Sequence, residues 1–273
     1  MMRNLCFLLI LVFGSIVAGC ATTPAAPVVG VNSLGVVSAF GDEFQMLTIG
    51  TTVFNNSEGS GDISEWGVNE LAINSMKTAL AGKYELVDVE YPREFFNTES
   101  KEKITGAWID NTPKLISDMV RDKITPVSGE APDAYLIVIP EYSATAFRGY
   151  PTFVDLGLYS MSLLGDRKTY VWVGAQMVLV DADTWEVLRR KSFRSSWATA
   201  KMEKRLKNAG AAYWRVDNSL WAKDFDSLVE EQKEAIRATI EDYVKDAAAR
   251  TLEQIGLTPT VAAEEYSSQF VRL

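Results

Sequence analysis

Ala134-Tyr135-Leu136-Ile137-Val138-Ile139 is an uninterrupted apolar run of strand length. A strand with one solvated face would alternate apolar and polar side chains, whereas a strand buried on both faces carries a continuous apolar run. The stretch therefore predicts a central strand of a sheet that is covered on both sides.

Two pairs of β-rich segments lie on either side of this run. Leu34–Phe40 is separated from Phe44–Phe54 by Gly-Asp-Glu, and Tyr170–Val180 is separated from Trp185–Trp197 by Asp-Ala-Asp-Thr. Short polar clusters between β-branched runs favour tight turns, so we expect two β-hairpins. The polar segment Asn55–Gly61 that follows the first pair is typical of a loop.

Three amphipathic helices are expected. Asp62 and Glu65 resemble a capping box before an apolar face that stops at Gly82. Thr112 before Pro113 is a typical start of a second helix. Ser227 and Glu230 form a second capping box, and apolar residues then recur at helical spacing as far as a stop at Gly256.

This order of hairpin, helix, strand, helix, strand, hairpin and helix indicates an α/β (α+β) fold. We expect a mixed β-sheet with two β-hairpins, amphipathic helices packed on it and a long C-terminal helix. The expected α/β domain is single and covers residues 33–258, with a C-terminal tail at 259–273.

Two motifs carry a family resemblance. Tyr84–Val89 is a short strand that follows the first expected helix, and the late hairpin runs Val180-Asp181-Ala182-Asp183-Thr184-Trp185-Glu186-Val187. With the element order from Thr48 onward, they resemble the α/β domain of the curli-secretion-channel lipoproteins and the amino-terminal domain of the translocation protein TolB. Trp185 stands where those families usually carry glycine. The resemblance implies the fold more than a function.

The first twenty residues have the layout of a lipoprotein signal. Arg3 precedes the apolar run Leu5–Val17, which is shorter than the roughly 20 residues that a membrane-spanning helix needs. Val17-Ala18-Gly19-Cys20 resembles a bacterial lipobox. We expect a signal peptide at residues 1–19, cleavage between Gly19 and Cys20, and a lipid, such as palmitate, on Cys20.

The segment after the lipobox is expected to tether a globular body to a membrane. Residues 20–32 contain Pro24 and Pro27, which disfavour helix. Ala21, rather than Asp, follows the cysteine, and for a Gram-negative lipoprotein this implies a periplasm-facing position on the outer membrane.

Composition excludes several kinds of chemistry. The chain has no histidine, so Ser-His-Asp catalysis, Cys-His catalysis and the usual zinc sites are excluded. Cys6 lies in the expected signal peptide and Cys20 is expected to be lipidated, which leaves no free thiol or disulfide. We therefore expect no enzyme and no cofactor apart from the covalent lipid. A net charge of −9 argues against a nucleic-acid partner.

One basic stretch stands out in this acidic chain. The segment from 189 to 207 contains eight basic side chains: Arg189, Arg190, Lys191, Arg194, Lys201, Lys204, Arg205 and Lys207. They form either a patch for anionic headgroups or another envelope polyanion, or a solvated strand edge protected against edge pairing. The second interpretation is the favoured one.

Two apolar segments have alternative interpretations as well. Tyr213, Trp214 and Trp221 form either a partner surface or a lid on the sheet, and the lid is slightly favoured. Phe147–Leu164 is either a flexible surface loop, which we prefer, or a membrane-dipping hairpin; its alternation is poor and includes Asp155.

These observations favour a non-catalytic, membrane-anchored lipoprotein that binds an envelope protein or polymer as an assembly or accessory factor. A homo-oligomeric secretion or export component is a variant of this hypothesis. The rival is a carboxylate-dependent hydrolase of envelope glycan or peptide, which requires a cleft with an acid of raised pKa.

Overall fold

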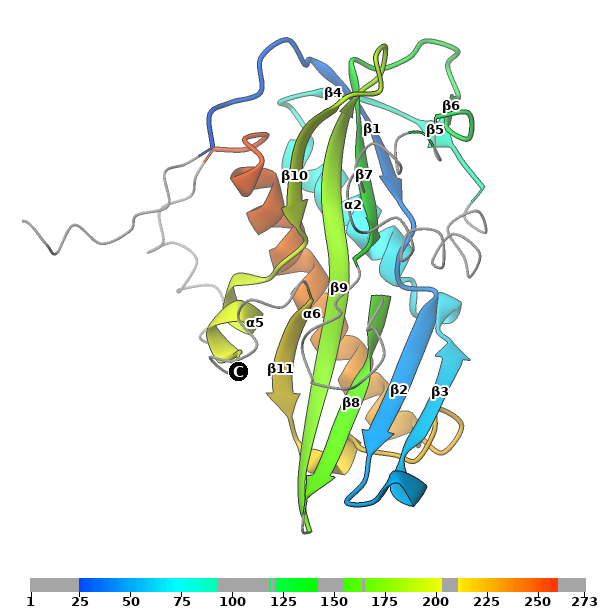
Figure 1. Ribbon diagram of the computed structural model, residues 1–273. Helices are drawn as coiled ribbons and strands as arrows, with labels where there is room; N and C mark the ends of the chain where they lie inside the picture. The colour runs from blue at the N-terminus through cyan, green and yellow to red at the C-terminus, as the bar shows by residue number, and fades with distance from the viewer. Residues whose placement is uncertain are drawn as a thin grey trace, which may run out of the picture.

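A mixed sheet with helices on one face forms the architecture (Figure 1). The computed structural model describes residues 25–92, 118, 121–141, 155–163, 165–202 and 211–259. Within these residues the sheet has nine strands. They are β1 (Ser33–Ser38), β2 (Glu43–Ile49), β3 (Ser57–Asp62), β4 (Glu85–Val87), β7 (Ala134–Pro140), β8 (Asp155–Leu163), β9 (Asp166–Asp181), β10 (Val187–Ser192) and β11 (Ala212–Val216). A separate two-stranded ladder pairs β5 (Val89–Glu90) with β6 (Thr125–Pro126).

The long strand β9 joins two halves of the sheet. Residues Ala175–Asp181 of β9 pair with β7 and β10, and β7 continues to β1 and β4; we call this the upper half. Residues Asp166–Gly174 of β9 pair with β8 and β11, and β8 continues to β2 and β3; this is the lower half. Figure 1 shows the halves end to end along β9.

The predicted first hairpin is wrong, because β1 and β2 do not pair with each other. β1 is parallel to β7 in the upper half, and β2 is parallel to β8 in the lower half, so the chain continues in one direction between them. The connection bends at Gly41, whose φ is 93°, and the Gly41 N–H donates to Asp155 Oδ1 at 2.9 Å. This buried hydrogen bond holds the two halves together where a turn was expected.

The strand that forms an antiparallel pair with β2 is β3, which begins within the segment that the sequence predicted to be a loop. β3 has the sequence Ser-Glu-Gly-Ser-Gly-Asp and lies at the edge of the sheet. An edge strand pairs through its backbone and needs no apolar side chains, which explains why its composition predicted a loop.

The second predicted hairpin is confirmed. β9 and β10 are antiparallel, and Asp181 Oδ1 accepts the Thr184 N–H at 2.7 Å and the Asp183 N–H at 3.1 Å in the turn. Trp185, which stands where the resembled families have glycine, has a φ of 60°. Its ring stacks on Tyr135 at a centroid distance of 5.1 Å.

The three described helices include one that was not predicted, and the other two differ from prediction at their ends. The helices are α2 (Val68–Leu80), α5 (Ser196–Lys201) and α6 (Glu230–Gln254), with 3₁₀ turns at Val53–Asn55, Ser64–Trp66 and Asn218–Leu220. The first expected capping box is wrong in detail, because Asp62 caps the short turn at Ser64 and α2 begins only after Gly67, whose φ is 64°.

At the start of α6, Gln232 accepts the Val229 N–H at 3.0 Å, whereas Ser227 bonds to Asp224. The helix therefore begins at Glu230, three residues after the expected cap. Gly256, with a φ of 81°, follows its end as predicted. The helix predicted from Pro113 lies outside the described residues, apart from the helical Asp118.

The central-strand prediction for residues 134–139 is confirmed. All residues of β7 are buried. Leu136 and Val138 join the core cluster that includes α2 and α6, whereas Ile137 and Ile139 join a second cluster on the other face. The chain is thus an α/β protein with a mixed sheet and a long C-terminal helix. Across the part of the chain that the structure describes, no helix has the length and apolar character to span a membrane.

Candidate functional site

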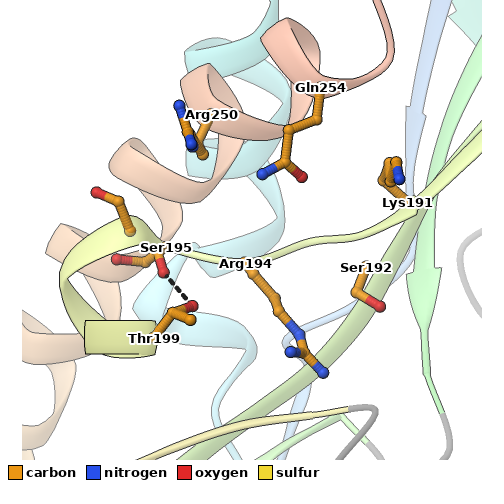
Figure 2. A pocket seen from close by; sticks show the side chains of 8 residues that line it. Lys191, Ser192, Arg194, Ser195, Thr199, Arg250 and Gln254 are labelled. Atoms are coloured by element: carbon orange, nitrogen blue, oxygen red, sulfur yellow. Dashed lines mark hydrogen bonds between the residues drawn. The ribbon is translucent and has the colours of Figure 1, made fainter. Parts of the chain in front are cut away.

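A groove of about 550 Å³ opens between the edge of the upper half and the C-terminal part of α6 (Figure 2). Its walls come from the end of β10, from α5 and from the last turns of α6. Figure 2 shows Arg250 and Gln254 on the helix side and Lys191 and Ser192 on the strand side; the Arg194 side chain starts between them and extends away from Arg250 and Gln254. The lining residues are Lys191, Ser192, Arg194, Ser195, Ser196, Thr199, Arg250 and Gln254.

Cationic side chains from different segments line this groove. Lys191 is exposed near the end of β10. Arg194 is half-buried in the connection between β10 and α5, and Arg250 lies on α6. Arg250 Nη1 lies 3.1 Å from Glu253 Oε2, so one arm of its guanidinium is already engaged. A guanidinium presents five N–H groups, and one such ion pair leaves others to face the groove.

The floor of the groove is held by the buried carboxylate of Asp246. Asp246 Oδ2 accepts the Ser195 hydroxyl at 2.6 Å, the Ser196 N–H at 2.7 Å and the Ser196 hydroxyl at 3.1 Å. These bonds fasten α5 to α6. The Ser195 hydroxyl also accepts the Ala198 N–H at 3.3 Å as the N-cap of α5. Ser195 and Asp246 therefore form a structural clamp, and Ser195 is not an exposed nucleophile.

Glu141, at the junction of the two halves, lies behind Ser192. The Ser192 hydroxyl donates to Glu141 Oε1 at 3.2 Å. Burial raises the pKa of the Glu141 carboxyl to about 7, although the Ser192 hydrogen bond and the charges of Arg194 and Arg190 act in the opposite direction. Among the described residues, Oε2 has no hydrogen-bond partner. A carboxyl group with this pKa can change its charge near neutral pH.

The structure brings together only part of the predicted basic patch. Lys191 and Arg194 line the groove. Arg189 and Arg190 are exposed on β10, where successive side chains point to opposite faces. Lys201 lies on α5, with its ammonium 5.0 Å from the centre of the Trp197 ring. Lys204, Arg205 and Lys207 lie outside the described residues.

The predicted partner surface at Tyr213, Trp214 and Trp221 is wrong. Tyr213 and Trp214 are 0% and 2% exposed, because β11 is a strand of the sheet and not part of a connection. Trp214 stacks on Tyr243 of α6 at 5.1 Å. Trp221 is half-buried and donates its indole N–H to Thr48 Oγ1 at 2.9 Å. The alternative, that these rings pack on the sheet, fits the structure better.

The preferred loop interpretation of Phe147–Leu164 is also wrong where it can be compared with the structure. Asp155–Leu163 is β8, which pairs with β2 on one side and with β9 on the other, so it is neither a surface loop nor a membrane-dipping hairpin. Its poor alternation has a packing reason: Gly157 takes the place of a side chain beneath the Trp172 ring. Residues 147–154 lie outside the described residues, as do Gly19 and Cys20.

Sequence reasoning missed Arg250, Gln254 and Glu141. Arg250 and Gln254 lie more than forty residues beyond the basic stretch, and only the packing of α6 beside β10 brings them to the groove. For Glu141, one signal was present: an acid directly follows the Pro140 that ends a buried strand. Within the described part of the chain, no group of three or more His, Cys, Asp or Glu residues could hold a metal ion.

Two solved structures are distantly similar to this chain. No protein-family model and no curated protein matches the chain. Protein XCC0632 from Xanthomonas campestris, of family DUF330, is similar with a TM-score of 0.34 and 8% identity, over 90% of this chain and 95% of that one. Lipoprotein GNA1162 from Neisseria meningitidis is similar with a TM-score of 0.22 and 14% identity, over 77% of this chain and 96% of that one. Likenesses this distant carry no inference about what the chain does.

Proposed function

We propose that the chain is a non-catalytic, lipid-anchored lipoprotein of the cell envelope that binds an anionic partner through the basic groove. The anchor is the lipid expected on Cys20, and Ala21 after it favours the outer membrane with the domain facing the periplasm. The observation that carries the binding role is that Lys191 of β10 and Arg250 of α6, which are far apart in the sequence, line one open groove. The absence of histidine supports a role without acid–base catalysis by imidazole.

The anchor is tested by the mass and the location of the native protein. We expect a processed chain that begins at an acylated Cys20 and fractionates with the outer membrane, and a Cys20→Ala variant that loses the acyl mass. A full-length, unmodified chain that is recovered with the cytosol would contradict the proposal.

The binding role is tested by crosslinking in intact cells from a photoreactive residue at Ser196, on the groove. The matched position is Asn74, which is exposed on α2. We expect a product from Ser196 that is absent from Asn74 and is lost in the double variant Lys191→Gln/Arg250→Gln. Raising the salt from about 0.15 M to about 1 M shortens the Debye length from about 8 Å to about 3 Å and should weaken the interaction in vitro. Products that do not depend on these two charges would contradict an anionic partner.

The curli-channel and TolB resemblance supports an oligomeric variant, in which the chain is one subunit of a secretion or export component. The size of the detergent-extracted protein decides this variant. A monomer at working concentration would exclude a ring.

A second function, a carboxylate-dependent hydrolase of envelope glycan or peptide, is supported by Glu141. Its pKa of about 7 suits a general acid, and its partner Ser192 lines the groove. This hypothesis predicts turnover of purified envelope polymers that Glu141→Gln abolishes. The absence of turnover by the native protein would favour the non-catalytic proposal.

A further inference from the structure

We propose that the groove binds the phosphate of an anionic lipid headgroup in the membrane to which the chain is anchored. This inference rests on the proposed function and assigns a ligand class to the same groove. Two observations support it: the donors that line the groove, and the place where the tether enters the domain.

The donors suit a phosphate group. Arg250 carries a guanidinium group, which can bind phosphate through two parallel N–H bonds, and Lys191 adds a compact positive charge. Gln254 contributes an amide on the helix side. A volume of about 550 Å³ is in the range of small-molecule sites and exceeds what a bare phosphate ion fills, so a phosphate with an attached headgroup fits better.

Three acids beside the groove are engaged with protein groups: Glu141 accepts the Ser192 hydroxyl at 3.2 Å, and the other two are Asp246 and Glu253. Asp246 accepts hydrogen bonds from Ser195 and Ser196, and Glu253 pairs with Arg250. Asp246 and Glu253 are nearly buried, at 3% and 8% exposure, whereas Lys191 is exposed. The charge that an approaching ligand meets is therefore mainly positive.

The tether enters the domain beside this groove. The Val28 N–H donates to the Gly256 carbonyl oxygen at 3.4 Å, and a Cβ at Gly256 would lie 2.4 Å from the Ala26 carbonyl oxygen. Residues 26–28 thus pack on the end of α6, and Figure 1 shows the start of the described chain at this end. Arg250 is six residues before Gly256, or about 9 Å along a helix.

This position brings the groove close to the bilayer. Five residues lie between Cys20 and Ala26, so the covalent path from the acylated cysteine to the domain spans six residue steps and is at most about 22 Å. The other end of α6 lies about 37 Å farther along the helix. The phosphate could belong to a lipid headgroup or be free in solution. A headgroup in the same leaflet explains why the groove lies close to the bilayer, whereas the binding of free phosphate would not depend on that position.

The test measures amide hydrogen exchange in the full acylated chain reconstituted into vesicles. One set of vesicles contains only phosphatidylcholine, which has no net charge, and the other a roughly three-to-one mixture of phosphatidylcholine and phosphatidylglycerol. We expect amides of residues 191–199 to exchange about tenfold more slowly in the anionic vesicles. A ligand at about ten times its dissociation constant lowers the population of the locally open, exchange-competent state about tenfold.

Matched variants separate the groove from general charge. Lys191→Gln/Arg250→Gln should abolish the protection. Lys168→Gln/Arg215→Gln, which removes the same charge from the lower half, should retain it. If the Arg250 change disturbs folding because Glu253 loses its partner, Lys191→Gln alone should still reduce the protection. Equal exchange in the two vesicle types, or protection that survives both groove variants, would overturn the proposal.

A third arm adds inorganic phosphate to the phosphatidylcholine vesicles. Protection equal to that in the anionic vesicles would identify free phosphate as the ligand and would also overturn the headgroup proposal. The mass of the reconstituted chain tests the anchor separately. If Cys20 carries no acyl group, the proposed function fails, and the same exchange experiment with added vesicles still decides whether the groove binds an anionic headgroup.

Discussion

The upper and lower halves of the sheet share β9 but pack differently on the face opposite α6. In the upper half this face is mainly aliphatic, with Val37, Ile137, Ile139, Val178 and Val180 in one cluster. In the lower half, Trp214 stacks on Tyr243 of α6, and successive side chains of a strand point to opposite faces. By this alternation, and by the pairing of β8 and β11 with β9, four buried aromatic residues lie on the face opposite α6. They are Tyr159, Tyr170, Trp172 and Tyr213.

This difference explains why one half was easier to predict from the sequence. Aliphatic side chains of similar size give a continuous apolar run and tolerate small shifts. Large rings need space from their neighbours, and Gly157 provides it: a Cβ there would lie 2.1 Å from the Trp172 ring and 2.3 Å from the Gln45 carbonyl oxygen. The same glycine interrupts the apolar pattern of β8 and made it resemble a loop.

The largest expected effect is that of Gly157→Ala in the lower half. The added methyl group meets both a buried ring and a backbone oxygen, so we expect a loss of about 3 kcal/mol or more in the free energy of unfolding. Denaturant unfolding measures this loss. Gly59→Ala is the control, since nothing lies within 4 Å of its added methyl group, and it should change stability by less than about 1 kcal/mol. Equal effects at the two glycines would break the contrast between tight and open packing.

The next effect tests the junction of the halves through Glu141. Burial raises the pKa of this carboxyl from an ordinary value of 4.5 to about 7, so the folded chain holds an extra proton between these pH values. The stability that this proton contributes is fully present below about pH 4.5 and is lost as the pH rises through about 7. Glu141→Gln should therefore match the native protein at low pH and exceed it above pH 7 by on the order of 3 kcal/mol.

The measurement is a series of denaturant unfolding curves from pH 4 to pH 8. Glu58→Gln, at an exposed position of β3, removes the same charge and should leave the pH profile almost unchanged. A Glu141→Gln variant with the native pH profile would show that the carboxyl is not buried as described.

A smaller effect is expected for Gly35→Ala in the upper half. The new methyl group would lie 2.8 Å from the Tyr135 ring and 3.0 Å from a Val89 methyl group, and both neighbours are side chains. Because side chains can yield where the backbone cannot, we expect a loss of about 1–2 kcal/mol in the unfolding free energy. A cost as large as that of Gly157→Ala would show that the aliphatic half is no more tolerant than the aromatic half.

The smallest effect is expected at Trp185, in the hairpin turn of the upper half. Its φ of 60° is strained for a residue with a Cβ, which costs about 1–2 kcal/mol, while its stacking on Tyr135 contributes about 0.5–1.5 kcal/mol. Trp185→Gly relieves the strain and loses the stacking, so its net effect should be within about 1 kcal/mol. Trp185→Ala loses the stacking and keeps the strain. Thermal unfolding should therefore show the alanine variant to be less stable than the glycine variant.

The parts of the fold that the sequence predicted are those with local causes. The apolar run of β7, the turn after Asp181 and the stop at Gly256 each depend on residues close together in the chain. The prediction failed where pairing is non-local: β1 does not pair with β2, and β8 is a core strand. In the candidate site, Lys191 and Arg194 were predicted, but Arg250 was not, because no local pattern indicates which helix will pack beside β10.

The sequence by itself determined the absence of histidine, the lipobox-like motif and the position of the basic stretch, because these are matters of residue identity and of spacing along the chain. Only the tertiary structure decided that three of the cations line one groove, that residues 26–28 pack on the end of the helix that lines this groove, and that Tyr213 and Trp214 are core residues. The physical reason is that burial and proximity arise from long-range packing, in which residues fifty or more positions apart become neighbours.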